Sequence, residues 1–162
     1  MSQEEQNKAV LTRFWEEVWD QGKLDVVDEI FHPNFVDHGL APGLTKQGPE
    51  GAKEAVLQFR SAIPDLYLKV DHMVAEGDKV MTRWEAGGTQ SGPMKSGRGT
   101  IPPTNKKAVV RGFTINRVED GKIIDAWDNF DIMGMLQQLG VIPSQGGPPG
   151  SGGPPPEGDG RG

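Results

Sequence analysis

Residues 109–131, VVRGFTINRVEDGKIIDAWDNFD, contain two runs of alternating apolar and polar residues that are joined by Asp120-Gly121. An Asp-Gly pair between two such runs is typical of a β-hairpin with a two-residue turn. Pairing outward from that turn places Phe113 opposite Asp128. Because side chains alternate between the two faces of a strand, we expect one apolar face with Asp128 among its members. The apolar members of that face are Phe113, Ile115, Ile124, Ala126 and Phe130.

A carboxylate on an apolar face is unusual. Burying it costs several kcal/mol unless it is paired, hydrogen-bonded or protonated. Asp128 therefore either reaches solvent at the end of its strand or lies in a pocket where a shifted pKa is useful. The hairpin pattern leaves both alternatives open.

The composition of the chain excludes several classes of protein. Its 162 residues suit one domain, and its formal net charge of −6 argues against binding to nucleic acid or to an anionic membrane. It has no cysteine, which excludes a disulfide scaffold, a thiol nucleophile and a thiolate metal site. Neither a signal peptide nor an apolar run of roughly 20 residues is visible, so we expect a cytoplasmic protein.

The composition changes sharply after Pro143. Residues 144–162 read SQGGPPGSGGPPPEGDGRG, in which 13 of 19 positions are Gly or Pro. This segment has no aliphatic or aromatic side chain to bury, so the sequence predicts a disordered tail. The folded domain is expected to cover residues 4–143.

Before the hairpin, the hydrophobic period changes from that of helices to that of strands. Ser2 and Glu5 have the spacing of a capping box, and the helix that follows is expected to end at Gly22. Further helices are expected at residues 24–31, 49–62 and 132–139, a brief extended piece at 35–38, strands at 66–75, 80–88, 107–118 and 122–130, and loops at 41–48 and 91–105. This order favours an α+β fold, with N-terminal helices packed on one face of a curved antiparallel sheet.

Seven segments between about residues 8 and 141 carry a family resemblance. They are FHPNFVDHG (31–39), PEG (49–51), FRSAIPDL (59–66), VAEGDKVMTRWEAGGTQSG (74–92), IPPTNKKAVVRGF (101–113), RVEDGKIIDAWDNFD (117–131) and QQLG (137–140). Together they resemble the SnoaL-like polyketide cyclases, or ester cyclases, of the nuclear transport factor 2 (NTF2)-like and ketosteroid isomerase-like superfamily. The resemblance implies an NTF2-like cone, whose strongly curved sheet encloses an apolar pocket. It also implies acid/base chemistry on a small molecule without metal or cofactor.

The resemblance implies that Asp128 is the catalytic residue. The essential aspartate of the family follows a tryptophan, and Trp127-Asp128 holds that place here. Desolvation in an apolar cavity would raise the pKa of Asp128 into the range useful for proton transfer. Many relatives carry an imidazole two residues earlier, where this chain has Ala126. Alanine can neither orient nor share a proton, which strengthens a non-catalytic alternative.

The remaining candidates are substrate-binding residues. His38 matches the VDH motif of the family and is expected to border the pocket. Arg111 is expected either to pair with Asp128 or to lie exposed at the edge of its strand. The other candidates are Trp15, Trp84, Phe113, Ile115, Ala126 and Phe130, and for the tryptophans the alternative is ordinary core packing. The three histidines have no metal-site spacing, and no phosphate-binding glycine motif is present, so no metal or cofactor is expected.

The residues and the resemblance together favour a SnoaL-like cyclase that acts on an apolar, polyketide-like carbonyl substrate. Asp128 would remove a proton next to one carbonyl, and the enolate would attack a second carbonyl in an intramolecular aldol-type reaction. One alternative is another acid/base reaction in the same pocket, either isomerisation or an epoxide hydrolysis helped by Asp37 or Glu85. The other is a non-catalytic domain that binds small molecules. We also expect a homodimer, because Ile123 and Trp127 would share the face opposite Asp128.

Overall fold

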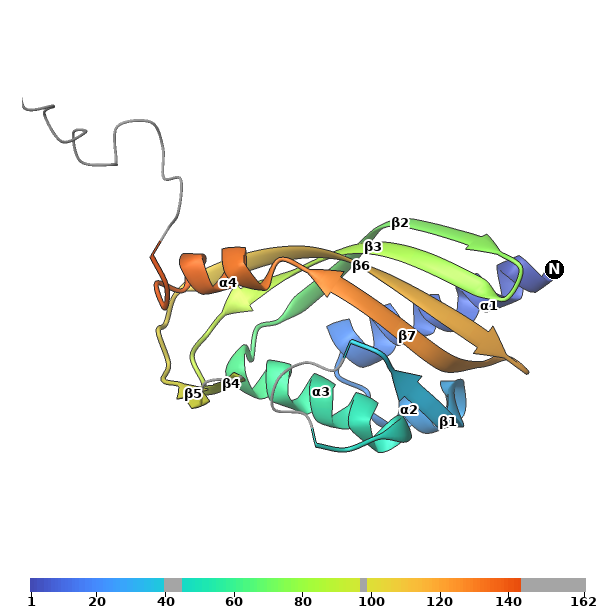
Figure 1. Ribbon diagram of the computed structural model, residues 1–162, viewed down its shortest axis with the longest axis horizontal. Helices are drawn as coiled ribbons and strands as arrows, with labels where there is room; N and C mark the ends of the chain where they lie inside the picture. Colours follow the sequence, from blue (N-terminus) through green and yellow to red (C-terminus); the bar gives the residue numbers. More distant parts are fainter. Residues whose placement is uncertain (40–44, 97–98, 144–162) are drawn as a thin grey trace, which may run out of the picture.

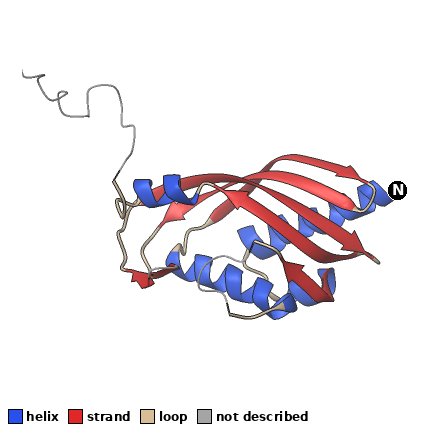
Figure 2. Cartoon of the chain, in the orientation of Figure 1, coloured by secondary structure: helices blue, strands red, loops and turns tan. Residues whose placement is uncertain are grey.

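The computed structural model describes residues 1–39, 45–96 and 99–143. The tail predicted at residues 144–162 and part of the loop predicted at 41–48 lie outside the described residues. In the described part, helices cover the concave side of a curved sheet (Figures 1 and 2). The expected α+β fold is therefore confirmed. Among the described residues, no helix is long and apolar enough to cross a membrane.

The N-terminal helices form where the sequence predicts them. Ser2 Oγ accepts a hydrogen bond from Glu5 N–H at 3.1 Å, and Ser2 N–H donates to Glu5 Oε2 at 3.2 Å, which completes the capping box. The helix then widens into a π-helical segment and stops at Gly22, where φ is 74°. The helices are α1 (Gln3–Arg13), the π-helix η1 (Phe14–Asp20), α2 (Asp25–Ile30), α3 (Gly48–Ala62) and α4 (Ile132–Gln138).

The main sheet has the strand order β1-β7-β6-β3-β2. Its strands are β1 (Phe31–Asp37), β2 (Tyr67–Glu76), β3 (Lys79–Thr89), β6 (Lys107–Glu119) and β7 (Lys122–Phe130). β1 pairs in parallel with β7, whereas the sequence predicted four antiparallel strands and only a brief extended piece here. A second small sheet, β4 (Met94–Ser96) with β5 (Gly99–Ile101), lies within the segment that was expected to be a loop.

The hairpin of β6 and β7 differs by one residue from the predicted register. Val118 pairs with Ile123, but Arg117 pairs with Asp125, so Ile124 is an extra, bulged residue. A β-bulge places two residues of one strand against one residue of its partner. The residue opposite Asp128 is consequently Thr114 and not Phe113.

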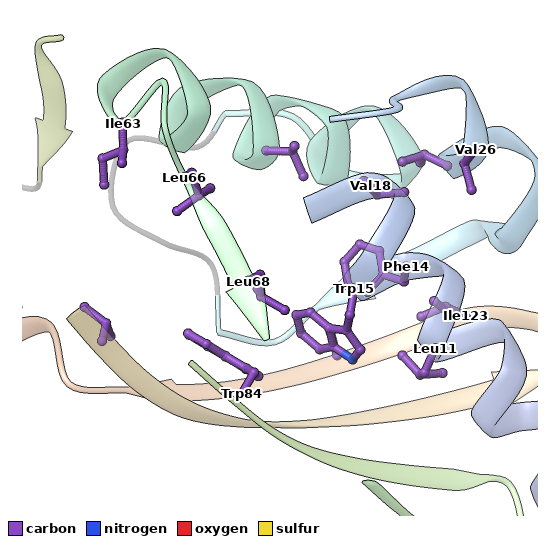
Figure 3. Close-up of a cluster of buried hydrophobic side chains, with 14 of the residues drawn as sticks. Leu11, Phe14, Trp15, Val18, Val26, Ile63, Leu66, Leu68, Trp84 and Ile123 are labelled. Carbon is purple, nitrogen blue, oxygen red and sulfur yellow. The ribbon is translucent and has the colours of Figure 1, made fainter. Parts of the chain in front are cut away.

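The bulge corrects the predicted face. Phe113 and Ile115 are 48% and 40% exposed on the outer side of the sheet, so the expectation that they share a face with Asp128 is wrong. The inner side packs on the helices through a core of aliphatic and aromatic side chains. Figure 3 shows Trp15 of η1 facing Trp84 of the sheet, and the ring of Phe14 packs against Trp15. This packing holds the helices over the concave surface, where the cavity lies.

Candidate active site in the concave face of the sheet

A cavity of about 140 Å³ lies between the helices and the concave face of the sheet. Its walls are mainly aromatic and aliphatic, and they include the candidate residues Trp15, Trp84, Ala126 and Phe130. Apart from the indole groups, its polar lining side chains are Asp37, Thr114, Asn116 and Asp128. An apolar cavity with a few convergent polar groups is the usual form of a small-molecule site.

Asp128 is held by a short chain of hydrogen bonds. Trp84 Nε1 donates to Thr114 Oγ1 at 2.9 Å, and Thr114 Oγ1 donates to Asp128 Oδ1 at 2.6 Å. Burial raises the pKa of Asp128 to about 6, the hydrogen bond from Thr114 opposes this rise, and the negative charge of Asp37 adds to it. The carboxyl group can therefore gain and lose a proton near neutral pH.

Asp37 lies beside Asp128 because β1 runs parallel to β7. Its Cα partner on β7 is Ala126, two residues before Asp128. Gly39 comes so close that a Cβ at this position would lie 3.3 Å from the carbonyl oxygen of Asp128. Gly39 N–H donates to Asp37 Oδ1 at 2.9 Å. Burial raises the pKa of Asp37, while this hydrogen bond and the charge of His38 act in the opposite direction.

Asn116 is a further polar side chain of the cavity and lies on β6, on the opposite side of β7 from Asp37. It pairs with Ala126 from β6, and its Nδ2 donates to the backbone oxygen of Asp125 at 3.2 Å. That bond orients the amide and leaves Oδ1 as a buried acceptor with no hydrogen-bond partner among the described residues. The small Ala126 side chain thus has Asp37 on one neighbouring strand and Asn116 on the other.

Arg111, Phe113 and Ile115, which were predicted to contact substrate, do not line the cavity. Arg111 is exposed on the outer side of the sheet and forms an ion pair with Glu85 at 2.8 Å. Of the two alternatives for Arg111, the structure shows the exposed position and not the pairing with Asp128, and Glu85 does not line the cavity. These three side chains lie on the outer side because of the bulge at Ile124. Beyond the bulge, odd-numbered residues of β6 pair with odd-numbered residues of β7 and share the face opposite Asp128.

His38 borders the site from outside. Its Nε2 lies 2.8 Å from Asp125 Oδ1, and its ring stacks on Trp127 with the centroids 4.6 Å apart. It does not line the cavity. Thr114 and Asn116 were not among the predicted site residues, because the predicted register of the hairpin placed them on the outer face of the sheet. No local signal marked them, because polar residues that alternate with apolar ones are expected on the solvent side of a strand.

No metal centre is evident in the described ranges. Within residues 1–39, 45–96 and 99–143, no group of three or more His, Asp or Glu side chains is arranged to hold a metal ion. The polar groups of the cavity are two carboxyls, one hydroxyl and one amide. These groups suit proton transfer and hydrogen bonding to a small organic molecule.

Comparisons with known proteins identify the family of the chain. The family model for SnoaL-like polyketide cyclases matches residues 9–139. A Bacillus cereus ATCC 10987 protein, provisionally described as a polyketide cyclase, is 31% identical with a TM-score of 0.72, over 85% of this chain and 82% of that one. TsrD from Streptomyces laurentii is 28% identical with a TM-score of 0.76, over 88% of this chain and 99% of that one. IdmH from Streptomyces antibioticus, also provisionally described as a polyketide cyclase, is 29% identical with a TM-score of 0.70. The match covers 84% of this chain and 99% of that one.

No curated protein sequence matches the chain significantly. The family match covers most of the chain and includes both the helices and the strands that line the cavity. The chain therefore belongs to the SnoaL-like polyketide cyclase family.

Proposed function

We propose that this protein is a cofactor-independent cyclase that uses Asp128 as its general acid/base. The observation that carries the proposal is a buried carboxyl in an apolar cavity, with a pKa of about 6. A group that titrates near the working pH is well suited both to take and to return a proton. The family membership supports a cyclase-type reaction on a small molecule.

In the proposed reaction, the Asp128 carboxylate removes a proton from the carbon next to a carbonyl group. The resulting enolate attacks a second carbonyl in the same molecule, and Asp128 returns the proton to the alkoxide so formed. Thr114 fixes one oxygen of Asp128, which leaves the other oxygen for the substrate. The proposed reaction needs the two carbonyl groups to be held close together, and such positioning can contribute roughly 7–11 kcal/mol to lowering the barrier.

The size of the cavity bears on the substrate. A volume of about 140 Å³ suits a group about as large as a single benzene ring. We infer that the enclosed space takes the reacting end of an apolar, carbonyl-bearing substrate. A small aryl ketone such as phenylacetone is therefore a suitable probe for the first step, because its α protons exchange with D₂O once an enolate forms.

Asp128→Asn tests the proposal, because it keeps the shape of the side chain and removes the titratable group. Exchange of the α protons of phenylacetone, followed by NMR, should slow by roughly 10²–10⁴-fold. Affinity, followed by the intrinsic fluorescence of the tryptophans, three of which (Trp15, Trp19 and Trp84) line the cavity, should change little, since apolar walls supply most of the binding.

Asp120→Asn is the matched control for this test. Asp120 lies in the hairpin turn with a φ of 50°, a conformation that asparagine also tolerates. It should leave the exchange rate unchanged. If both the native protein and Asp128→Asn bind the ketone and neither catalyses exchange, the chain is a binding domain and not an enzyme.

A second candidate function is the addition of water to an epoxide. Asp37 and Asn116 line the same cavity as Asp128, and a water molecule held among them would be positioned for deprotonation. Incubation with styrene oxide in H₂¹⁸O, followed by mass spectrometry, tests this candidate. A diol that carries ¹⁸O would support it, and the absence of enzyme-dependent diol would count against it.

We also propose that the protein forms a homodimer through the outer face of its sheet. An apolar row crosses four strands there, through the successive pairs Val74–Met81, Met81–Ile115 and Ile115–Trp127. Val74, Ile115 and Trp127 are 55%, 40% and 38% exposed. A continuous apolar surface of this kind is typical of a protein interface, and a second copy would offer the same row in return.

A further inference from the structure

The side chain of Asn116 is a buried amide that lines the cavity and is 1% exposed. Its Nδ2 donates to the backbone oxygen of Asp125 at 3.2 Å. Its Oδ1 is the one buried side-chain nitrogen or oxygen atom of the described residues that has no hydrogen-bond partner. Buried polar groups in proteins nearly always have partners, so this exception calls for an explanation.

The two other buried amides of the described residues use both their oxygen and their nitrogen. Asn7 accepts from Gln3 Nε2 at 2.9 Å and donates to a backbone oxygen at 3.3 Å. Gln90 accepts from the Thr104 hydroxyl at 2.7 Å and donates to a backbone oxygen at 3.0 Å. Neither Asn7 nor Gln90 lines the cavity. The unpartnered oxygen is therefore found at the position where a ligand would lie.

The surroundings of Asn116 determine which end of its amide is free. A backbone carbonyl oxygen can only accept, so Nδ2 faces Asp125 and Oδ1 faces away from it. The reverse orientation would bring two acceptors together. The partners of Asn116 on the neighbouring strands are Val80 and Ala126, whose side chains have no hydrogen to donate. A donor for Oδ1 therefore has to come from a molecule in the cavity.

A hydroxyl group is the simplest ligand group that fits this amide. Oδ1 requires a donor, and the amide nitrogen keeps a second N–H, so a group that both donates and accepts is favoured. Carbonyl and ether oxygens cannot donate. An ammonium ion would need several acceptors around it, and the side chains of Val80 and Ala126 offer none.

Asn116 is also within reach of a molecule that contacts Asp128. Asn116 pairs with Ala126, and Thr114, two residues earlier on β6, pairs with Asp128. Diagonal neighbours of this kind in a sheet lie about 7–8 Å apart. This separation is comparable to the length of a substituted phenyl ring. A hydroxyl on the ring of a substrate can therefore reach Asn116 while the acidic C–H group lies at Asp128.

We propose that Asn116 is a specificity-determining residue, whose Oδ1 accepts a hydrogen bond from a hydroxyl group of the substrate. This inference rests on the proposed function only in taking the ligand of the cavity to be the substrate. A ligand with the hydroxyl satisfies the buried acceptor, and a ligand without it leaves the acceptor unpaired. A polar site of this kind discriminates more sharply than an apolar wall does.

The first test compares the binding of phenol with that of fluorobenzene, which is similar in size and cannot donate. Isothermal titration calorimetry gives the Kd of each ligand for the native protein and for Asn116→Leu. The ratio of the Kd of fluorobenzene to that of phenol should be roughly 10–100-fold larger in the native protein than in the variant. Comparing these ratios removes the difference in hydration between the two ligands.

Asp128→Leu is the competing variant, because a phenol hydroxyl can also donate to a carboxylate. A ratio that falls in Asp128→Leu but not in Asn116→Leu would assign the hydroxyl to Asp128 and overturn the inference. Equal ratios in the native protein and Asn116→Leu would show that a water molecule, and not the ligand, is the partner of Oδ1.

A second measurement uses the native protein alone. In ¹H–¹⁵N NMR spectra, the side-chain amide signals of Asn116 should shift on saturation with phenol and shift much less with fluorobenzene. The amide signals of Asn7, which is bonded on both sides away from the cavity, should move with neither ligand. An Asn116 amide that responds equally to both ligands would overturn the inference, even if Asn116→Leu proves unable to fold.

The third measurement separates this inference from the proposed function. The α-proton exchange of 4-hydroxyphenylacetone should have a kcat/KM roughly 10–100-fold above that of phenylacetone, and Asn116→Leu should lose this preference. Exchange of both ketones without such a preference would overturn the role of Asn116 alone. No exchange of either ketone, together with a preference for phenol that depends on Asn116, would count against the proposed function and support this inference.

Discussion

Asp128 is the residue at which stability and function oppose each other. Its pKa rises from 3.8 to about 6 on folding, which corresponds to about 3 kcal/mol of unfavourable free energy once the group is ionised. Between these values the folded protein binds more protons than the unfolded chain. The free energy of unfolding must therefore fall as the pH rises through 6. The loss of about 3 kcal/mol that is due to Asp128 disappears completely only below about pH 4.

Asp128→Asn should consequently stabilise the protein where the native carboxylate is ionised. We expect the free energy of unfolding to increase by about 1–3 kcal/mol at pH 8 and to change little at pH 4. Asparagine can still accept the hydrogen bond from Thr114, so the gain should not be cancelled by an unpaired hydroxyl. Urea unfolding at several pH values, with Asp120→Asn as the control, measures the difference. Equal changes at both pH values would show that Asp128 is not desolvated.

At the scale of elements, the bulge in β7 determines which side chains reach the cavity. Val118 pairs with Ile123 and Arg117 with Asp125, so Ile124 has no partner in the ladder. Deleting a residue from a bulge leaves the pairing of the others intact, whereas deleting one from a regular ladder moves later side chains to the other face. The two kinds of deletion should therefore have opposite consequences.

Deletion of Ile124 should give a folded protein in which Asp128 still lies in the cavity. The cost should be about 1–3 kcal/mol, because a buried side chain is lost. Deletion of Ile115, in the regular part of β6, should abolish cooperative unfolding, because Thr114 and the residues before it would face the wrong side. Circular dichroism during urea unfolding distinguishes the two. A folded Ile115 deletion together with an unfolded Ile124 deletion would contradict the observed register.

At the scale of the whole molecule, the two faces of the sheet carry different chemistry. The concave face lines the cavity, and the outer face carries the apolar row through Val74, Met81, Ile115 and Trp127. If the outer row is the interface of a homodimer, a lysine in its centre should break the dimer, because a buried unpaired charge is costly.

Ile115→Lys should therefore give a monomer in sedimentation velocity at tens of micromolar, while the native chain sediments as a dimer. Leu57→Lys is the control, because Leu57 is 52% exposed on α3 and does not belong to the sheet. This variant should remain dimeric. A native protein that sediments as a monomer at high micromolar concentration would rule out the proposed interface.

Local patterns were sufficient to predict the helices and the two long hairpins, whereas the hairpin pattern left open whether Asp128 reaches solvent or lies in a pocket. The capping box at Ser2, the Asp120-Gly121 turn and the strand alternation act over a few residues, so they can be recognised without knowing the rest of the chain. Trp15 and Trp84 belong both to the cavity lining and to the core, so the two alternatives for them do not exclude each other. Each lies in an amphipathic element whose apolar face must be buried.

The composition of the polar site depended on contacts between distant segments. Asp37 reaches Asp128 only because β1 adds to the sheet in parallel with β7, and no local pattern specifies that pairing. Thr114 and Asn116 face the cavity because a single bulged residue shifts the register, which also turns Arg111 and Phe113 outward. The alternation of β7 was compatible with both registers. The observed register buries Thr114 and Asn116 and exposes Phe113 and Ile115, an arrangement that strand alternation alone does not predict because both registers keep the alternation.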